Sequence, residues 1–317
     1  MTERHDGNTG WMLIQRNGKV STVPLGEVSH QEVVAWVDLN SWDASHLMDT
    51  LSLLGASVDP DGWPVGWQRV PSRASMMGGG DAFWVVLFMP GKEGTWAPIG
   101  IVTGAQWVVT IHDGALEPLR ELWQDALSGS VEVLHSPFHA LYEILETVAD
   151  QYLDSIDKYQ DRFDQLEDDI LSGQNRARDV FEMRREIHAM RRVLADQRRV
   201  SARLARRVTG KSQDQAFIDV YDAFYHVIDN ADGLRDNLTG LVDLQLNQHS
   251  ARLNEVMKFL TIFSTIFLPL SFMTGFLGMN LHDMSELSWP HVQPMTIGAM
   301  VLVAGSLLYF FKRKGWL

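Results

Sequence analysis

The chain has 317 residues, enough for two ordinary domains, and a formal net charge of −13 at pH 7. The acidic balance argues against nucleic acid as a partner and suits cations, although solubility alone would also account for it. There are no cysteines, which excludes disulfides and thiolate metal sites.

Residues 1–135 carry a mixed pattern of short strands and helices. Two helices are expected between the strands, one opening at Ser41 and one over about 116–127. Turn signals such as Asp59-Pro60-Asp61-Gly62 and Gly78-Gly79-Gly80 separate these elements. The isolated pair His112-Asp113 is interpreted as structural, and no nucleophile, base or cofactor motif emerges, so an enzyme is not expected. Four β-rich runs stand out: WMLIQ at 11–15, VVAWVDL at 33–39, AFWVVLFM at 82–89 and QWVVTIH at 106–112.

From Ser136 the pattern becomes helical. Ser136 fits an N-cap and Pro137 the first turn, and apolar residues recur every three or four positions until Gly173. The first helix is rich in aspartate over 150–164, and a second amphipathic helix is rich in arginine over 184–207. These charges predict an antiparallel hairpin with complementary, paired faces. A cation-attracting role for the acidic face is the alternative.

A third helix is expected to begin near Ser212, with Gln215 as its capping-box partner. No proline interrupts it before Pro269, so one helix over about 213–278 would be roughly 100 Å long. Because a single rod cannot bury an apolar stripe alone, we expect this helix to pack against copies of itself. The stripe comprises Phe217, Val220, Phe224, Val227, Ala231, Leu234, Leu238 and Leu241.

Two apolar segments without charges lie near the C-terminus, at 259–278 and 294–311. At about 1.5 Å per residue the first is roughly 30 Å long, the thickness of a bilayer core. Buried core helices are the alternative, but two such runs favour a membrane protein. We expect spans at about 258–278 and 294–311, joined by an external loop at 279–293.

Basic residues near the spans indicate the orientation. Lys258 precedes the first span and three basic residues at 312–314 follow the second, whereas the loop has no Lys or Arg. The positive-inside rule therefore places both termini in the cytoplasm, and the N-terminus lacks a signal-peptide pattern. We expect a cytoplasmic α/β part at 1–135, a cytoplasmic hairpin and stalk helix at 136–257, and a transmembrane domain at 258–317.

A second stripe on the long helix is polar or small. Its hydroxyls and glycines could let membrane helices pack closely, or the stripe could face a water-filled path among several copies. Because it stays polar for four turns before the membrane and includes Asp243, we favour a pore, with Met257 and Leu268 as constrictions that gate by dewetting. The stripe reads Gly240, Asp243, Asn247, Ser250, Asn254, Met257, Thr261, Ser264, Leu268, Ser271, Gly275 and Gly278.

The tripeptide GMN at 278–280 stands at the outer end of the first span, before an acidic loop, a second span and a basic tail. In this setting the chain resembles the CorA family of divalent-cation transporters. The segments RLNEVMKFLTIFSTIFLPLSFMTG from Arg252, MSELSWP from Met284 and FKRKGWL from Phe311 are also similar. The resemblance is sharp over 250–317 and only architectural over the first 210 residues.

This resemblance implies a fold and an activity. The fold would be an α+β cytoplasmic domain, a very long stalk helix and two C-terminal transmembrane helices, assembled as a funnel-shaped homopentamer in the lipid bilayer of the inner membrane. The activity would be Mg²⁺ influx, with Co²⁺ and Ni²⁺ as accompanying ions and no organic cofactor, through a pore closed by intracellular Mg²⁺.

The resemblance also implies site residues. The selectivity filter would lie at Gly278, Met279 and Asn280, and the loop acids Asp283 and Glu286 would concentrate cations. Asp219, with Asp81 as its partner, would hold the regulatory Mg²⁺. The pore would be lined by Asp243, Asn247, Asn254, Met257, Thr261, Ser264, Leu268, Ser271 and Gly275.

Two departures from the family pattern concern the outer mouth. Ser285 stands where the family usually has proline, and Leu277 where an aromatic residue often precedes GMN, which leaves the geometry there open. A zinc-preferring transporter of the same family and a membrane-anchored metal sensor or scaffold that does not conduct are the alternatives. Met279 and the segment 284–287 favour Mg²⁺, because the zinc branch commonly replaces that methionine.

Overall fold

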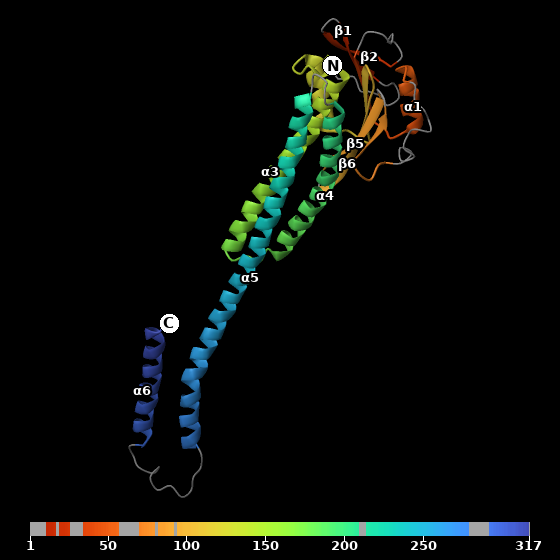
Figure 1. The fold of residues 1–317 in the computed structure, drawn as a ribbon. Coiled ribbons are helices and arrows are strands. Elements are labelled where there is room, and N and C mark those ends of the chain that lie inside the picture. Colours follow the sequence, from red (N-terminus) through yellow and green to blue (C-terminus); the bar gives the residue numbers. More distant parts are fainter. Residues whose placement is uncertain are drawn as a thin grey trace. The chain divides into compact units, whose positions relative to one another are not determined.

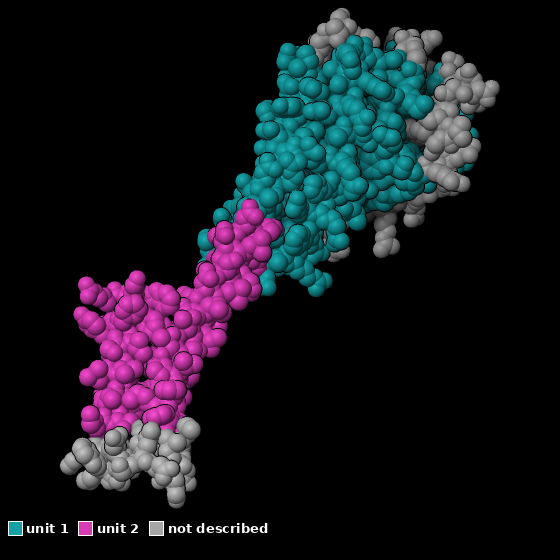
Figure 2. Space-filling model, turned by 60° about the horizontal axis from the view of Figure 1, so that its bottom comes forward, with its two compact units in different colours: residues 1–241 teal, residues 242–317 magenta. Residues whose placement is uncertain are grey.

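The computed structural model describes residues 11–16, 19–25, 34–56, 70–79, 82–91, 94–208, 214–278 and 292–316. The chain divides into two compact units, residues 1–241 and 242–317 (Figure 2). In chain order the elements are β1 (Trp11–Arg16), β2 (Lys19–Pro24), β3 (Ala35–Leu39), α1 (Ala44–Leu53), β4 (Ser75–Gly79), β5 (Ala82–Pro90), β6 (Trp96–Thr103), β7 (Trp107–His112), α2 (Glu117–Ser128), a 3₁₀ turn (Val133–His135), α3 (Pro137–Leu171), α4 (Ala177–Val208), α5 (Asp214–Gly278) and α6 (Val292–Arg313) (Figure 1).

The first unit is built on a sheet with strand order β2-β1-β3-β7-β6-β5-β4. Strands β3 and β7 are parallel, and the other neighbouring pairs are antiparallel. On one face, Leu47 and Leu51 of α1 join the apolar core of the sheet. Successive strand residues point to opposite faces, and on the other face Trp36 of β3 lies 5.0 Å from Trp123 of α2, between ring centroids. Helices therefore cover both faces.

The four β-rich runs are confirmed as β1, β3, β5 and β7, but the sequence pattern misses β2, β4 and β6. Strand β4 contains Gly78 in a left-handed conformation (φ 108°), where a Cβ atom would lie 2.8 Å from Phe83 Cα. The glycines read as a turn signal thus lie largely within a strand. In β6, Pro98 pairs with β5 but precedes the stretch that pairs with β7, so its missing N–H is tolerated.

The predicted helix starts are close to those observed. The Ser136 hydroxyl accepts a hydrogen bond from the His139 backbone N–H at 3.0 Å, which caps α3 as predicted. The helix expected from Ser41 begins at Ala44 instead, because Asp43 is the N-cap and accepts from Ser45 N–H at 2.9 Å. Ser212 lies outside the described residues.

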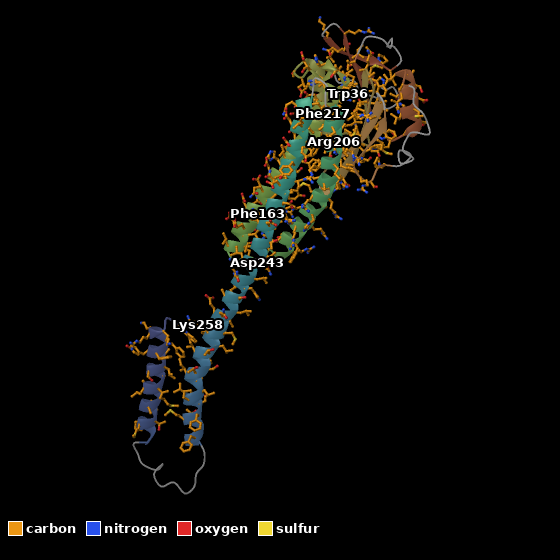
Figure 3. The ribbon with its side chains drawn as sticks, in the orientation of Figure 1. Trp36, Phe163, Arg206, Phe217, Asp243 and Lys258 are labelled. Atoms are coloured by element: carbon orange, nitrogen blue, oxygen red, sulfur yellow. The ribbon has the colours of Figure 1, made fainter. Side chains whose placement is uncertain are left out.

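The apolar stripe at 217–241 of α5 is buried within the first unit, at 0–3 % exposure. Phe217 and Phe224 contact Tyr142 and Tyr152 of α3, at ring-centroid distances of 6.5 and 6.3 Å (Phe217 is labelled in Figure 3). The expectation that this stripe packs against copies of the chain is therefore wrong, because α3 and α4 of the same chain cover it.

A buried polar network joins these helices to the sheet. The Tyr152 hydroxyl donates to the Phe88 carbonyl of β5 at 2.8 Å, and Gln197 of α4 donates to the Tyr152 oxygen at 2.6 Å and to the same carbonyl at 3.1 Å. The Tyr152 ring also stacks on Trp96 of β6 at 5.8 Å. Because buried polar atoms are costly when unpaired, this network fixes α3 and α4 against the sheet.

The hairpin of α3 and α4 forms as predicted, but its charged faces do not pair with each other as expected. Along the described lengths of the two helices, the ion pair that joins them is Arg162–Glu186 at 2.7 Å. At the turn, Arg176 contacts Asp169 and Asp179. Other charged side chains of the hairpin pair elsewhere: Arg191 contacts Asp232 of α5 at 2.6 Å, and Asp196 contacts Arg73 at 3.4 Å.

His112, the last residue of β7, is 4 % exposed and structural, as interpreted. Its Nδ1 lies 2.7 Å from the Gly114 carbonyl and its Nε2 lies 3.2 Å from Asp38 Oδ2. Because both partners are acceptors, the ring is doubly protonated in this geometry. Burial lowers the pKa of His112, but the Asp38 carboxylate and the Gly114 carbonyl outweigh it, and the pKa is raised above its ordinary value of 6.5.

This pair predicts a pH-dependent stability. Because the folded-state pKa is raised, the stabilisation is fully present below pH 6.5 and is lost as pH rises through the raised pKa. We expect His112→Gln to lower the free energy of unfolding by about 1.5–3 kcal/mol at pH 6 and by less at pH 8. Thermal unfolding at pH 6 and at pH 8 measures the loss of stability at each pH. Amide exchange of β3 and β7 then shows whether the loss lies in the first unit. An equal loss at both pH values would contradict the charged pair.

Candidate functional site

The polar stripe of α5 is solvent-exposed along its full described length in the second unit. Asp243, Asn247 and Asn254 are exposed, and so are Met257 (60 %) and Leu268 (75 %). The same holds for the small and hydroxylated members, Ser250, Thr261, Ser264, Ser271, Gly275 and Gly278. The predicted residues therefore share one open helix face, and Asp243 is labelled in Figure 3.

A different face of α5 packs on α6. Ile262 is 8 % exposed and Phe311 of α6 is 6 % exposed, and Lys258 Nζ donates to the Gly315 carbonyl at 3.3 Å. At 100° per residue, the face of Lys258 and Ile262 lies on the opposite side of the helix from Ser264 and Ser271. Close packing on α6 within the chain therefore does not explain the small residues of the stripe.

The hydroxyl groups of the stripe differ in their partners. Thr261 donates to the Met257 carbonyl of its own helix at 2.7 Å. Within the described part of the chain, the Ser264 and Ser271 hydroxyls make no hydrogen bond. An unpaired hydroxyl in a hydrocarbon environment is costly, so these two side chains call for water or for a neighbouring copy. Pro269 lacks an N–H, which leaves the Thr265 carbonyl without its usual helical donor.

Very little of either apolar segment is buried within the chain. The lower part of α5 and the helix over residues 294–313 are long and apolar enough to cross a membrane, and 6 % of each apolar window is buried. A soluble core helix would be largely buried. A further exposed face of α5 carries Phe259, Phe263 and Phe267, which stack on one another at centroid distances of 6.3 and 4.2 Å. Such a face suits lipid, and the chain is an integral membrane protein.

Several predicted site residues lie outside the described residues. These are Met279 and Asn280 of the filter, the loop acids Asp283 and Glu286, and the regulatory candidate Asp81. Gly278, the last residue of α5, is described and exposed. The C-terminal end of the stripe is therefore adjacent in sequence to Met279 and Asn280.

Asp219 lies on an exposed face of α5 in the first unit, where its carboxylate accepts from Gln215 Nε2 at 2.9 Å. Other acids lie nearby on α3: burial and the Glu146 carboxylate raise the pKa of Glu143, and burial followed by Glu146, Glu143 and Asp219 raises the pKa of Tyr142. Among the described residues, no group of three or more His, Asp or Glu side chains is placed to hold a metal ion. Asp219 thus has no complete ligand set in the described part of one chain.

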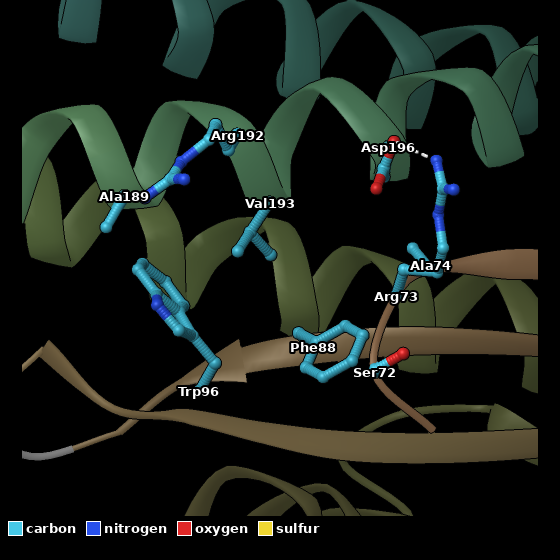
Figure 4. A pocket seen from close by; sticks show the side chains of 9 residues that line it. All are labelled: Ser72, Arg73, Ala74, Phe88, Trp96, Ala189, Arg192, Val193 and Asp196. Atoms are coloured by element: carbon cyan, nitrogen blue, oxygen red, sulfur yellow. Dashed lines mark hydrogen bonds and ion pairs between the residues drawn. The ribbon is translucent and has the colours of Figure 1, made fainter.

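A separate cavity of about 310 Å³ lies between α4 and the sheet (Figure 4). Trp96 and Phe88 extend from the sheet, and the Arg73–Asp196 ion pair of 3.4 Å closes one side. The remaining lining residues are Ser72, Ala74, Ala189, Arg192 and Val193. No sequence-predicted site residue lines this cavity, and no periodic or motif signal in the sequence points to it.

A family model and several known proteins match this chain. The family model described as "CorA-like Mg2+ transporter protein" matches residues 84–313. The cobalt/magnesium transport protein CorA of Thermotoga maritima is 33 % identical over 184 residues, covering 56 % of this chain, which spans about half (52 %) of that relative. The CorA protein of Methanocaldococcus jannaschii is 23 % identical over 317 residues, covering 96 % of this chain and 99 % of the relative.

A solved structure shows the same fold over the whole chain. The complete structure of the CorA magnesium transporter from Methanocaldococcus jannaschii superposes with a TM-score of 0.78 at 23 % identity, covering 97 % of this chain and 98 % of that one. The α/β part, the long helix and the C-terminal apolar helix are thus those of a full CorA fold. Because the family model matches well over half of the sequence, the chain belongs to the CorA-like Mg²⁺ transporter family.

Proposed function

We propose that this chain conducts divalent cations, Mg²⁺ above all and Co²⁺ and Ni²⁺ with it, through a water-filled path at the axis of a ring of copies. The observation that carries the proposal is the exposed polar stripe of α5, which faces away from α6 and contains two unpaired serine hydroxyls. Family membership and the names of the relatives, which are cobalt and magnesium transport proteins, support the same class of cargo.

The chemistry of the stripe suits a hydrated ion. Mg²⁺ requires octahedral oxygen coordination and gives up its water reluctantly. The amide oxygens of Asn247, Asn254 and Asn280 are neutral and can accept hydrogen bonds from the water shell without stripping it. Charged groups bind more tightly and hinder release, so an acid is better placed at the end of the path, where Asp243 stands.

The assembly belongs to the same proposal. The ring is a homopentamer in the inner membrane, with both termini in the cytoplasm, as the basic residues beside the spans indicate. Asn280, together with Gly278 and Met279, forms the outer filter, and Asp283 and Glu286 concentrate cations before it. The apolar side chains of Met257 and Leu268 narrow the path and close it by dewetting.

The gate responds to intracellular Mg²⁺ bound at Asp219. Within one chain this carboxylate has a single described hydrogen-bond partner, Gln215, and no complete metal-ligand set. The remaining ligands come from Asp81 or from another copy. Ion binding between copies then favours the closed arrangement when cytoplasmic Mg²⁺ is plentiful.

The filter assignment predicts the effect of one substitution. Asn280→Ala removes the amide oxygens that hold the hydrated ion, and we expect it to abolish most Mg²⁺ uptake into proteoliposomes while the protein remains folded and inserted. Uptake is followed with a Mg²⁺ indicator in the lumen, alongside Co²⁺, Ni²⁺ and Zn²⁺ in competition. Unchanged uptake would refute the filter. If the unmodified protein takes up none of these ions, the chain is a non-conducting sensor, and if Zn²⁺ is preferred, it is a zinc transporter.

The regulatory assignment is tested separately. Because Asp219→Asn removes a charged metal ligand but keeps its size, we expect uptake that continues at an internal Mg²⁺ concentration at which the unmodified protein is closed. Asp222→Asn, on the same exposed side of α5, is the matched control and should retain inhibition. Inhibition that persists in the Asp219 variant would place the regulatory site elsewhere.

The water-filled path predicts a pattern of chemical reactivity. The chain has no cysteine, so a single introduced thiol reports on its own surroundings. Thiolates react only where water reaches them, and we expect Ser264→Cys and Ser271→Cys to react with a charged, membrane-impermeant thiol reagent in liposomes. Phe263→Cys and Leu270→Cys, on other faces of the same helix, should stay unmodified. Equal reaction at all four positions would count against a path along the stripe.

A further inference from the structure

Three long helices of the first unit each bury one face and turn a charged face outward. They are α3, α4 and the part of α5 up to Leu241. The outward face of α3 carries an acidic row: Asp150, Asp154, Asp157, Asp161, Asp164 and Asp168, all exposed. The outward face of α4 carries an arginine row at seven-residue intervals: Arg178, Arg185, Arg192, Arg199 and Arg206, all exposed (Arg206 is labelled in Figure 3). Residues seven apart on a helix lie on the same face, about 10.5 Å from each other.

Most members of the two rows have no counter-charge within the described part of the chain. Among the described residues, no member of the acidic row forms a salt bridge, and in the arginine row only Arg199 does, with Asp196 on its own helix. The acidic side chains also crowd one another: partial burial, then Glu146 and Asp154, raise the pKa of Asp150. Apart from Arg199, the members of both rows therefore lack a partner of opposite charge among the described residues.

The hairpin sets the two rows in register. The 2.7 Å ion pair between Arg162 and Glu186 places these two positions at one height along the antiparallel helices. Counting outward from that pair, Arg185 stands level with position 163, beside Asp161 and Asp164. In the same way Arg192 is level with position 156, beside Asp157, and Arg199 with position 149, beside Asp150. Arg185, Arg192 and Arg199 thus each have an aspartate of α3 at their own height, and none of the three forms an ion pair with it among the described residues.

We propose that the arginine row of one copy docks on the acidic row of the next copy around the ring. A closed ring joins two different patches of each subunit, and each patch must complement the other. Rotation about an axis parallel to the helices does not change a residue's position along that axis. The register between α3 and α4 within one hairpin therefore also applies between α4 of one copy and α3 of the next. This inference rests on the proposed ring assembly and names the surfaces that hold its cytoplasmic part together.

As the docking surface for the arginine row, we favour the acidic row of α3 over the exposed aspartates of α5. Asp222, Asp229 and Asp236 continue the polar stripe of α5 along the helix, and in the proposed ring that face turns toward the axis. The acidic row of α3 then remains available for the contact between neighbouring copies. A second copy also fits better than an anionic polymer or lipid, because it supplies counter-charge to both rows, whereas the chain carries a net charge of −13.

Cross-linking of the full-length protein in membranes tests the register. The double variant Arg185→Cys/Asp164→Cys is treated with a short bis-maleimide, and the products are separated by denaturing gel electrophoresis. Since the native chain has no cysteine, only the introduced pair can react. We expect a ladder of covalent multimers that ends at the number of subunits in the ring. The matched control Arg185→Cys/Asp150→Cys keeps the same two faces but offsets them by 13 positions, about 20 Å, and should give monomer.

A charge exchange adds a second readout. Arg185→Glu/Arg192→Glu and Asp157→Arg/Asp164→Arg should each weaken assembly of the detergent-solubilised protein, because like charges then meet, and the combined quadruple variant should restore it. A ladder from the control pair equal to that from the matched pair would overturn the register. No ladder from the matched pair in a protein that still takes up Mg²⁺ would overturn this interface alone, and absence of uptake by the unmodified protein would instead overturn the proposed function.

Discussion

The long helix α5 has to be covered along its whole length, and this requirement shapes both compact units. One continuous helix of 65 residues must find cover for two chemically different surfaces. Over residues 217–241 its apolar stripe is buried against α3 and α4. Phe224, for example, contacts Tyr152 of α3. Beyond Leu241 the same helix has α6 beside it on one face only, and its remaining faces stay exposed in the single chain.

The remaining surfaces of α5 divide by chemistry, and this division gives the functional proposal. Phe259, Phe263 and Phe267 stack along one exposed face, as lipid requires, while hydroxyl, amide and carboxylate groups follow another. A polar face in a bilayer needs water or a partner, and a ring of copies supplies both at once. In the first unit, most members of the acidic and arginine rows lack a counter-charge among the described residues, and a neighbouring copy would supply it. The proposed ring thus provides partners for both the membrane and the cytoplasmic surfaces.

How far the sequence predicts this structure depends on how local each signal is. Ser136 and Pro137 start α3 where expected because capping is decided by a few adjacent residues. Strand β4 was hidden because glycines that elsewhere mark turns are required here by the close approach of Phe83. The wrong partner assigned to the stripe at 217–241 has a similar cause: periodicity shows that a helix face is buried, but not which helix buries it. In the candidate site, spacing alone placed the stripe members on one face, whereas the cavity beside Trp96 joins distant segments and leaves no sequence pattern.

If the stripe of α5 borders the conducting path, its apolar member Leu268 narrows that path, and a polar side chain at this position should open it to water. Leu268→Ser wets the proposed constriction, whereas Leu270→Ser makes the same change on another face of the helix, where Leu270 is half-buried. Mg²⁺ flux into proteoliposomes is measured with high Mg²⁺ inside, when the pore is closed. We expect a large leak in the Leu268 variant and none in the Leu270 variant. Equal flux in the two variants, or no leak in either, would argue against a conducting path along the stripe.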